Sequence, residues 1–532
     1  MRPPCNPQPV PKDVKVTKTP RTPVWDSTVN VDVEVTATGT PRNRLVTIGD
    51  SLTHGFQSGA IFKTDLSFPA LIARELGWYD EFVHPHYPAF GGIPLNIEWL
   101  IHELERDFGD KISWWEGVAA AVRIRQHLAE SEDWWDNGPG SQPPKDRRRC
   151  RNLGIYGWDL RDALERTVKT AGIGHRVPHI PFVPLIHNAD VVAALRVLDS
   201  ASKGGKPVTP LQAAQALGAE GVEGGPNADG DPGDGIETLI VELGANNALG
   251  SVISLRVCWS DKGYDKLDVK AKYNVWQPKH FKKELDLLAA EVRKIRARHV
   301  IWGTVPHVTI APVARGVGGK VGPHSRYFEY YTRPWIRDRD FDPDQDPHLT
   351  ADDARAVDSA IDQYNAFIVA TVEAGRNDGF DWRLLDLAGL LDRLASRRYI
   401  EDKDARPKWW RPYPLPAALQ NLNPPPDSRF FTSGPGGRTQ GGLFSLDGIH
   451  PTTIAYGLMA QEFINVMVDT GVTFYNQARE PRTPPIEIDF NQLVKQDTLI
   501  TDPPRSLVAD LALIGRLDQD IDILTRLWAG IG

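Results

Sequence analysis

The chain has 532 residues, of which 41% are hydrophobic and 24% are charged, and its formal net charge is −8. This hydrophobic fraction is sufficient for a folded core and too high for a fully disordered chain. The negative charge argues against general electrostatic attraction to nucleic acid. No apolar run reaches the roughly 18 residues that indicate a transmembrane helix. Neither nucleic acid nor a membrane span is therefore expected.

Cysteine is scarce, with only Cys5, Cys150 and Cys258 in the chain. An odd count without a Cys-x-x-Cys pair predicts neither a disulfide framework nor a zinc or thiol redox site. The first residues are basic and proline-rich, and they lack the apolar segment of a signal peptide. We predict a reducing, cytoplasmic location and a disordered tail over residues 1–28. A proline-rich ligand for a partner is the alternative for this tail.

Strand-like and helix-like patterns alternate after this tail. Valines alternate with polar residues over 29–35, which predicts a half-buried strand. Buried parallel strands are expected at 44–48, 238–243, 299–303 and 382–386. Helices are expected between Ser67 and Gly77 and over 281–295, 350–368 and 452–466. This alternation predicts an α/β fold with a Rossmann-like (flavodoxin-like) parallel sheet and helices on both faces.

Three segments interrupt the alternation, and we interpret them as insertions in one domain that spans residues 29–475. The insertion near 97–150 has helical patterns, the one near 203–236 indicates a surface loop, and the one near 400–442 is rich in proline, glycine and arginine. Tryptophan pairs lie at 114–115, 134–135 and 409–410. Core packing explains these pairs, and a grip on acyl chains or sugars is the alternative.

Residues 476–532 form a C-terminal extension with an apolar stripe between Leu507 and Trp528. The stripe predicts an amphipathic helix that docks on its own domain. Its spacing also approaches a heptad, so an oligomer formed through this helix is the alternative.

Ser51 follows the first buried strand in the turn GDSLTHG, residues 49–55. A serine at the carboxyl end of a parallel strand lies where α/β sheets place their sites. Its hydroxyl needs a neighbouring base to become a nucleophile. Taken alone, this turn is commonly only a helix cap.

Asp447 and His450 lie near the C-terminus in the stretch LDGIHPT, residues 446–452. His450 can accept a serine proton, and Asp447, three residues earlier, can hold the ring through its Nδ1–H. The alternatives are a polar turn before a helix or a pair of metal ligands. A metal pair lacks an evident third ligand.

Two further stretches carry groups that can donate hydrogen bonds to an oxyanion. NLGIYGWDL, residues 152–160, has glycines where a backbone N–H can approach a substrate closely. GANN, residues 244–247, places side-chain amides directly after a buried strand. An ordinary tight turn and a polar strand cap are the alternatives for these two stretches.

Together, the four stretches occur in the order Ser, Gly, Asn and Asp-x-x-His. With this set the chain resembles the GDSL esterase and lipase family, also called SGNH hydrolases. The resemblance runs from residue 44 to about residue 468, and a Gly-x-Ser-x-Gly elbow of another hydrolase class is absent from the sequence.

The resemblance implies a Ser-His-Asp triad of Ser51, His450 and Asp447 that hydrolyses acyl esters of small molecules or lipids without metal or organic cofactor. It implies an oxyanion hole made by the N–H groups of Ser51 and Gly157 and the amide of Asn246.

Asp50, His54 and Asn247 are expected to line the pocket or support it. Asn247 departs from the family pattern, which has aspartate at this position, and so puts the hydrogen-bond support of that loop in question. Two alternatives to ester hydrolysis remain open: acyl transfer to a sugar or another alcohol, and a non-catalytic binding protein on the same fold.

Overall fold

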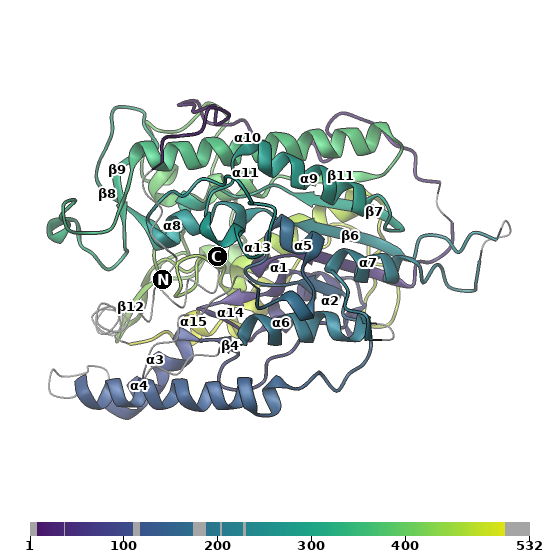
Figure 1. The fold of residues 1–532 in the computed structure, drawn as a ribbon, viewed down its shortest axis with the longest axis horizontal. Coiled ribbons are helices and arrows are strands. Elements are labelled where there is room, and N and C mark those ends of the chain that lie inside the picture. The colour runs from purple at the N-terminus through teal and green to yellow at the C-terminus, as the bar shows by residue number, and fades with distance from the viewer. Residues whose placement is uncertain are drawn as a thin grey trace.

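The computed structural model describes residues 8–36, 38–109, 117–173, 188–202, 205–226 and 230–505. Its centre is a five-stranded parallel sheet in the order β11-β7-β6-β1-β5 (Figure 1). The strands are β1 (Asn43–Gly49), β5 (Asn152–Gly154), β6 (Ile236–Glu242), β7 (Ala297–Gly303) and β11 (Trp382–Leu385). The predicted α/β class with a parallel central sheet is confirmed, and this strand order is that of doubly wound sheets.

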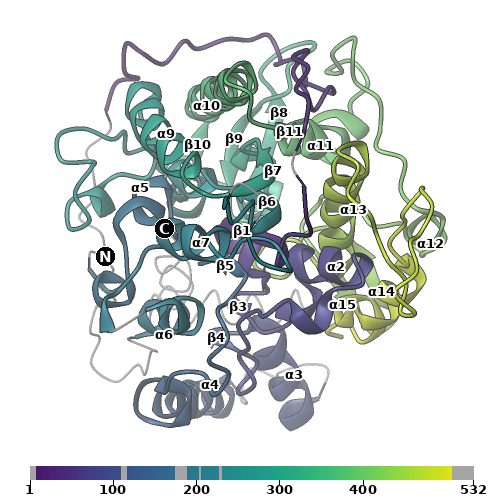
Figure 2. The ribbon, with the colours of Figure 1, turned by 90° about the vertical axis from the view of Figure 1, so that its right-hand side faces the viewer.

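Helices cover both faces of this sheet (Figure 2). On one face, α2 (Phe68–Glu75) packs against α13 (Thr453–Asp469), and on the other α9 (Pro278–Val292) packs against α10 (Ala351–Asn377). The strands between them are buried on both sides; Leu45, Val46 and Ile48 of β1 are fully inaccessible. Such coverage explains why these strands are continuous apolar runs.

The predicted helix boundaries are set by local signals. Ser67 occupies the N-cap of α2, and Gly77, with φ of 67°, lies just beyond its end. Thr350 and Asp353 form a reciprocal capping box at the start of α10. The helices expected around 68–76, 281–295, 350–368 and 452–466 are confirmed.

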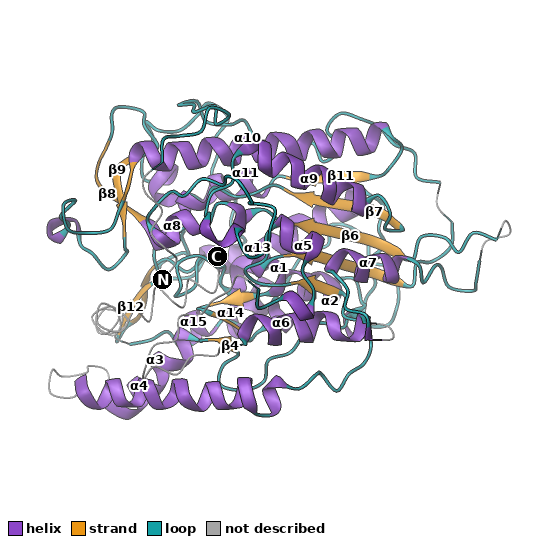
Figure 3. Cartoon of the chain, viewed as in Figure 1, coloured by secondary structure: helices purple, strands orange, loops and turns teal. Residues whose placement is uncertain are grey.

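The remaining elements surround this core (Figure 3). The other helices are α1 (Ser51–His54), α3 (Ile97–Phe108), α4 (Gly117–Glu132), α5 (Leu160–Glu165), α6 (Ala189–Leu198), α7 (Pro210–Gly218), α8 (Gly250–Ser254), α11 (Leu387–Leu394), α12 (Ala417–Gln420), α14 (Phe490–Gln496) and α15 (Thr498–Thr501). In the described part of the chain, three small antiparallel sheets are present: one of β2 (Phe56–Gln57), β3 (Ala60–Ile61) and β4 (Ile93–Pro94), one of β8 (Arg315–Lys320), β9 (Phe328–Thr332) and β10 (Leu349–Thr350), and one of β12 (Thr432–Gly434) and β13 (Gly437–Gln440).

The N-terminal segment differs from the predicted disordered tail over residues 8–28. The backbone N–H of Thr17 donates to Ser359 Oγ at 3.1 Å, and Arg21 and the N–H of Val24 both bond the carboxylate of Asp386, at 2.8 and 2.7 Å. Asp386 directly follows β11 and is only 5% exposed, so it needs such donors. The segment therefore has a fixed place because it neutralises a buried carboxylate.

The strand predicted over residues 29–35 is also wrong. Val29 and Asn30 have φ angles of 49° and 60°, so a turn interrupts the extended backbone. Alternation of valine with polar residues predicts one buried face and one exposed face, but it does not supply a neighbouring strand to pair with.

The insertions contain more regular structure than expected. Residues 203–236, predicted to be a surface loop, include the helix α7, which begins with a capping box between Thr209 and Gln212. Trp135 and Trp410 are buried, as the core-packing interpretation expects. The pair at 114–115 and the stripe from Leu507 to Trp528 lie outside the described residues, so the predicted C-terminal helix remains a prediction.

The cysteines include one free thiol, since Cys150 is unpaired and buried. Cys258 is disulfide-bonded, and disulfides are typical of oxidising compartments. In the described ranges, no helix has both the length and the apolarity to cross a bilayer.

Candidate active site

Ser51 lies at the carboxyl edge of the sheet, at the start of the short helix α1. The preceding strand runs close to its neighbour β6: a Cβ at Gly49 would lie 1.9 Å from Thr53 Oγ1 and 2.7 Å from the carbonyl oxygen of Glu242. Only glycine therefore fits there. Ser51 itself is 3% exposed, so a substrate can reach only a small part of it.

Ser51, His450 and Asp447 form one continuous hydrogen-bonded chain. The Nε2 atom of His450 is 2.9 Å from Ser51 Oγ, although the two residues are 399 positions apart. The Nδ1 atom of the same ring is 2.9 Å from Asp447 Oδ2. His450 and Asp447 are fully buried. This arrangement can remove the serine proton when an electrophile approaches.

The carboxylate of Asp447 is surrounded by donors. Besides the His450 ring, it accepts hydrogen bonds from the N–H groups of Ile449 (2.8 Å), His450 (2.9 Å) and Gly59 (3.0 Å). Burial alone would raise the pKa of Asp447, but His450 and these N–H groups hold it below its ordinary value. The carboxylate therefore stays ionised at neutral pH and fixes the orientation of the imidazole.

The predicted oxyanion residues Gly157 and Asn246 lie together. Gly157 follows β5 and has φ of 74°, and Asn246 follows β6. Asn246 Nδ2 donates to the carbonyl oxygen of Trp158 at 2.9 Å, and Gly157 and Asn246 both line a small polar cavity of about 20 Å³. Strands β5 and β6 flank β1, which carries the nucleophile. Within the described structure, Asn246 makes no hydrogen bond to Ser51.

His54 is a buried supporting residue. Its Nδ1 accepts from the N–H of Tyr156 at 3.2 Å, and its Nε2 is 2.9 Å from the hydroxyl of Tyr87. Burial lowers the pKa of His54 to about 3, so the ring is neutral and Nε2 carries its proton. His54 thus links α1 to the loop that contains Gly157.

Asn247 holds its loop through the backbone. Its carbonyl oxygen accepts from the N–H of Trp276 at 2.8 Å. Its side chain is buried, and its two polar atoms have no hydrogen-bond partner among the described residues. The loop therefore lacks the side-chain support that an aspartate was expected to give.

Sequence reasoning missed Glu242, the last residue of β6. It is 2% exposed and accepts from Thr53 Oγ1 at 3.1 Å. Burial raises the pKa of Glu242 well above its ordinary value, and the charge of Asp50 raises it further. A glutamate directly after the apolar run 239–241 was the available signal in the sequence.

Comparison of the chain with protein-family models, with curated proteins and with solved structures finds no match. Within the described ranges, no three His, Cys, Asp or Glu side chains are grouped so that they could hold a metal ion. The site is therefore interpreted from its own geometry.

Asp50 is expected to make folding stability depend on pH. Its Oδ1 caps α1 by accepting the N–H of Leu52 at 3.1 Å, and Oδ2 has no partner among the described residues. Burial raises the pKa of Asp50 from 3.8 to about 7. Between these values the folded state binds more protons than the unfolded state, so the free energy of unfolding falls as pH rises. Asp50→Asn should flatten this fall and stabilise the protein above pH 7 by on the order of 2–4 kcal/mol.

Urea unfolding at pH 5 and pH 8 checks this expectation. Asp352→Asn is the matched control, because the Asp352 side chain is 90% exposed. Identical pH slopes for the wild type and Asp50→Asn would contradict the raised pKa.

Proposed function

We propose that this protein is a serine esterase of the SGNH (GDSL) type that hydrolyses carboxylic acyl esters. The observation that carries this proposal is the chain from Ser51 Oγ through His450 to Asp447, with both hydrogen bonds at 2.9 Å. The positions of the four sequence stretches support it, because they occupy the carboxyl edge of a doubly wound sheet. GDSLTHG follows β1, NLGIYGWDL begins in β5 and continues beyond it, GANN follows β6, and LDGIHPT precedes α13.

The reaction proceeds by two acyl transfers. His450 Nε2 removes the proton as Ser51 Oγ attacks the ester carbonyl carbon. The developing oxyanion accepts hydrogen bonds from the N–H groups of Ser51 and Gly157 and from Asn246 Nδ2. His450 then protonates the leaving alcohol, which leaves an acyl-serine. A water molecule, deprotonated by His450, attacks this ester; His450 then returns the proton to Ser51 Oγ as the acyl–oxygen bond breaks and the carboxylic acid is released.

An apolar groove beside the triad favours a short acyl chain. Its lining includes Leu52, next to Ser51, and Ile449 and Pro451, on either side of His450. Side chains of α11 and α13 complete the wall. The groove measures about 120 Å³, below the roughly 300–1,000 Å³ of sites for drug-sized ligands. We propose that it holds the acyl group of the ester.

Hydrolysis of p-nitrophenyl esters from acetate to palmitate tests the proposal. We expect the highest kcat/KM for the short esters and a steep fall toward palmitate. Added acceptor alcohols distinguish transfer from hydrolysis, because transfer would form new esters. No hydrolysis of any chain length by a folded sample would contradict a general esterase.

Asn246→Ala is expected to lower kcat by about 10²–10³-fold with little change in KM, since the amide acts on the charge that develops in the transition state. The variant also loses its bond to the carbonyl of Trp158. Asn247→Ala, one residue away, is the matched control and should retain activity, because its side chain has no partner among the described residues. Equal losses in both variants would indicate a general effect on the loop.

A further inference from the structure

A second cavity, of about 450 Å³, lies apart from the triad. Its walls come from the β8–β9 hairpin, the helical turn at Ser396–Ile400 and the segment that leads into β12 and β13. Neither Ser51, Asp447 nor His450 contributes to the lining. Its volume falls within the roughly 300–1,000 Å³ that is typical of small-molecule sites.

The lining of this cavity is strongly basic. It contains two carboxylates, Asp338 and Glu401, and six arginines: Arg315, Arg326, Arg337, Arg397, Arg398 and Arg429. We call it the arginine cavity. Three of the arginines have close carboxylate partners: Arg315 with Asp338 (2.5 Å), Arg429 with Asp427 (2.6 Å) and Arg398 with Asp358 (2.8 Å).

Arg397 has no such partner. Among the described residues its side chain makes no ion pair or hydrogen bond, and its guanidinium lies 4.7 Å from the centre of the Phe328 ring. Its side chain is half-buried. Burial and the neighbouring Arg315 lower the pKa of Arg397 more than the carboxylates of Glu401 and Asp338 raise it, so its surroundings do not fully neutralise its positive charge.

Arg326 adds a buried positive charge to the same wall. It is 3% exposed, and its Nη2 has no hydrogen-bond partner in the described part of the chain. The nearest carboxylate oxygen to Nη2, Asp362 Oδ2, is 3.9 Å away. Because Nη2 is itself inaccessible and faces this carboxylate, Arg326 adds positive charge to the wall and offers no donor to a ligand.

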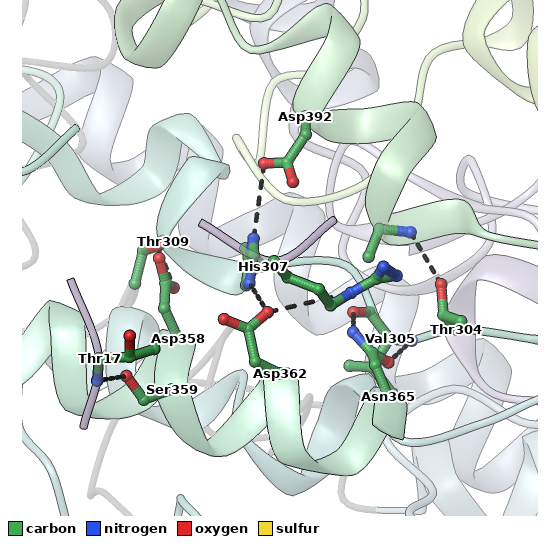
Figure 4. A network of polar contacts seen from close by, with 12 residues as sticks. Thr17, Thr304, Val305, His307, Thr309, Asp358, Ser359, Asp362, Asn365 and Asp392 are labelled. Atoms are coloured by element: carbon green, nitrogen blue, oxygen red, sulfur yellow. Dashed lines mark hydrogen bonds and ion pairs between the residues drawn. The ribbon is translucent and has the colours of Figure 1, made fainter. Parts of the chain in front are cut away.

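Buried charges lie behind this wall, and Figure 4 shows His307, Asp358, Asp362 and Asp392 among them. Arg398 Nη2 donates to Thr309 Oγ1 at 2.7 Å and to Asp358 Oδ2 at 2.8 Å. His307 lies between Asp362, at 2.9 Å, and Asp392, at 3.5 Å. These contacts fix the guanidinium of Arg398 before any ligand binds.

We propose that the arginine cavity binds an organic phosphate, with Arg397 as the principal contact. Guanidinium groups match the geometry of phosphate oxygens through paired N–H donors. A doubly charged phosphate monoester neutralises the uncompensated charge of Arg397 and of exposed Arg337, for which no ion pair occurs among the described residues. Phe328, Tyr331 and Phe430 give the organic part an aromatic wall. This inference does not depend on the proposed esterase activity.

Calorimetric titration of the full chain tests the site. Glycerol 3-phosphate is the phosphate probe, and glycerate is the carboxylate probe of similar size. We expect glycerol 3-phosphate to bind, with a Kd raised roughly tenfold or more in Arg397→Gln. Arg339→Gln is the matched control, because Arg339 is 74% exposed and lies outside the lining, and its Kd should equal that of the wild type.

Vesicles of phosphatidylcholine with and without phosphatidic acid identify the source of the phosphate. Binding only to the phosphatidic acid vesicles, lost in Arg397→Gln, would assign the site to a lipid headgroup and support the phosphate chemistry. If Arg397→Gln fails to fold, Arg397→Lys, which keeps the charge but loses the paired donors, replaces it. Three results would overturn the proposal: no binding of either phosphate probe, equal binding of glycerate, or binding unchanged in the Arg397 variant.

Discussion

Replacing Ser51 with alanine is expected to lower kcat for p-nitrophenyl ester hydrolysis at least ~10⁴-fold. The hydroxyl is the only group within 2.9 Å of His450 Nε2 in the described hydrogen-bond network. Without it, no acyl-serine forms, and only the oxyanion donors and substrate binding remain. Steady-state kinetics on a short-chain ester measure the loss.

The Ser51 variant should keep its fold, because it loses one hydroxyl group and no backbone hydrogen bond. Its melting temperature provides that check. Ser141→Ala is the matched control, since the Ser141 hydroxyl bonds the carbonyl of Gly138 within its own turn. Full activity in Ser51→Ala would show that Ser51 takes no part in the reaction.

Asp447→Asn should lower kcat by about 10³–10⁴-fold with little change in KM. An amide cannot stabilise the imidazolium that forms when His450 takes the serine proton. It also offers an N–H donor where the His450 Nδ1–H now donates to Oδ2. Kinetics over a range of pH measure the effect, with Asp352→Asn as the exposed control.

Asp447→Asn should also change how the free energy of unfolding depends on pH. The lowered pKa of Asp447 means that its ionised form stabilises the folded wild type above the unfolded pKa. This contribution is lost as pH falls through the folded pKa. The difference in unfolding free energy between wild type and Asp447→Asn should therefore shrink in acid. A difference that is constant with pH would contradict the donor-rich environment of this carboxylate.

The central sheet could be predicted because its evidence is local. The apolar runs that became β1, β6, β7 and β11 each lie close to the predicted positions, and the capping pair Thr350 and Asp353 marks the start of α10. The tail could not be predicted, because its order depends on the buried carboxylate of Asp386, more than 360 positions away in the chain. Composition alone carries no such information.

In the candidate site, too, features with local sequence evidence could be predicted and features that depend on tertiary contacts could not. Ser51, His450 and Asp447 were predicted from short motifs, and the structure brings them together. The environment of Asp50 and Glu242 was missed, because the strand pairing that places Gly49 beside Glu242 is a tertiary feature. The arginine cavity was missed for the same reason: its arginines lie between positions 315 and 429 and converge only in the fold.

Covalent labelling with a fluorophosphonate tests the central claim most directly. The reagent phosphonylates a serine only when a neighbouring base activates it. Mass spectrometry of the intact chain and of its peptides should show one adduct, on Ser51, absent from Ser51→Ala and strongly slowed in Asp447→Asn. A folded wild-type sample without an adduct on Ser51 would contradict an active triad and favour a binding protein on the same fold.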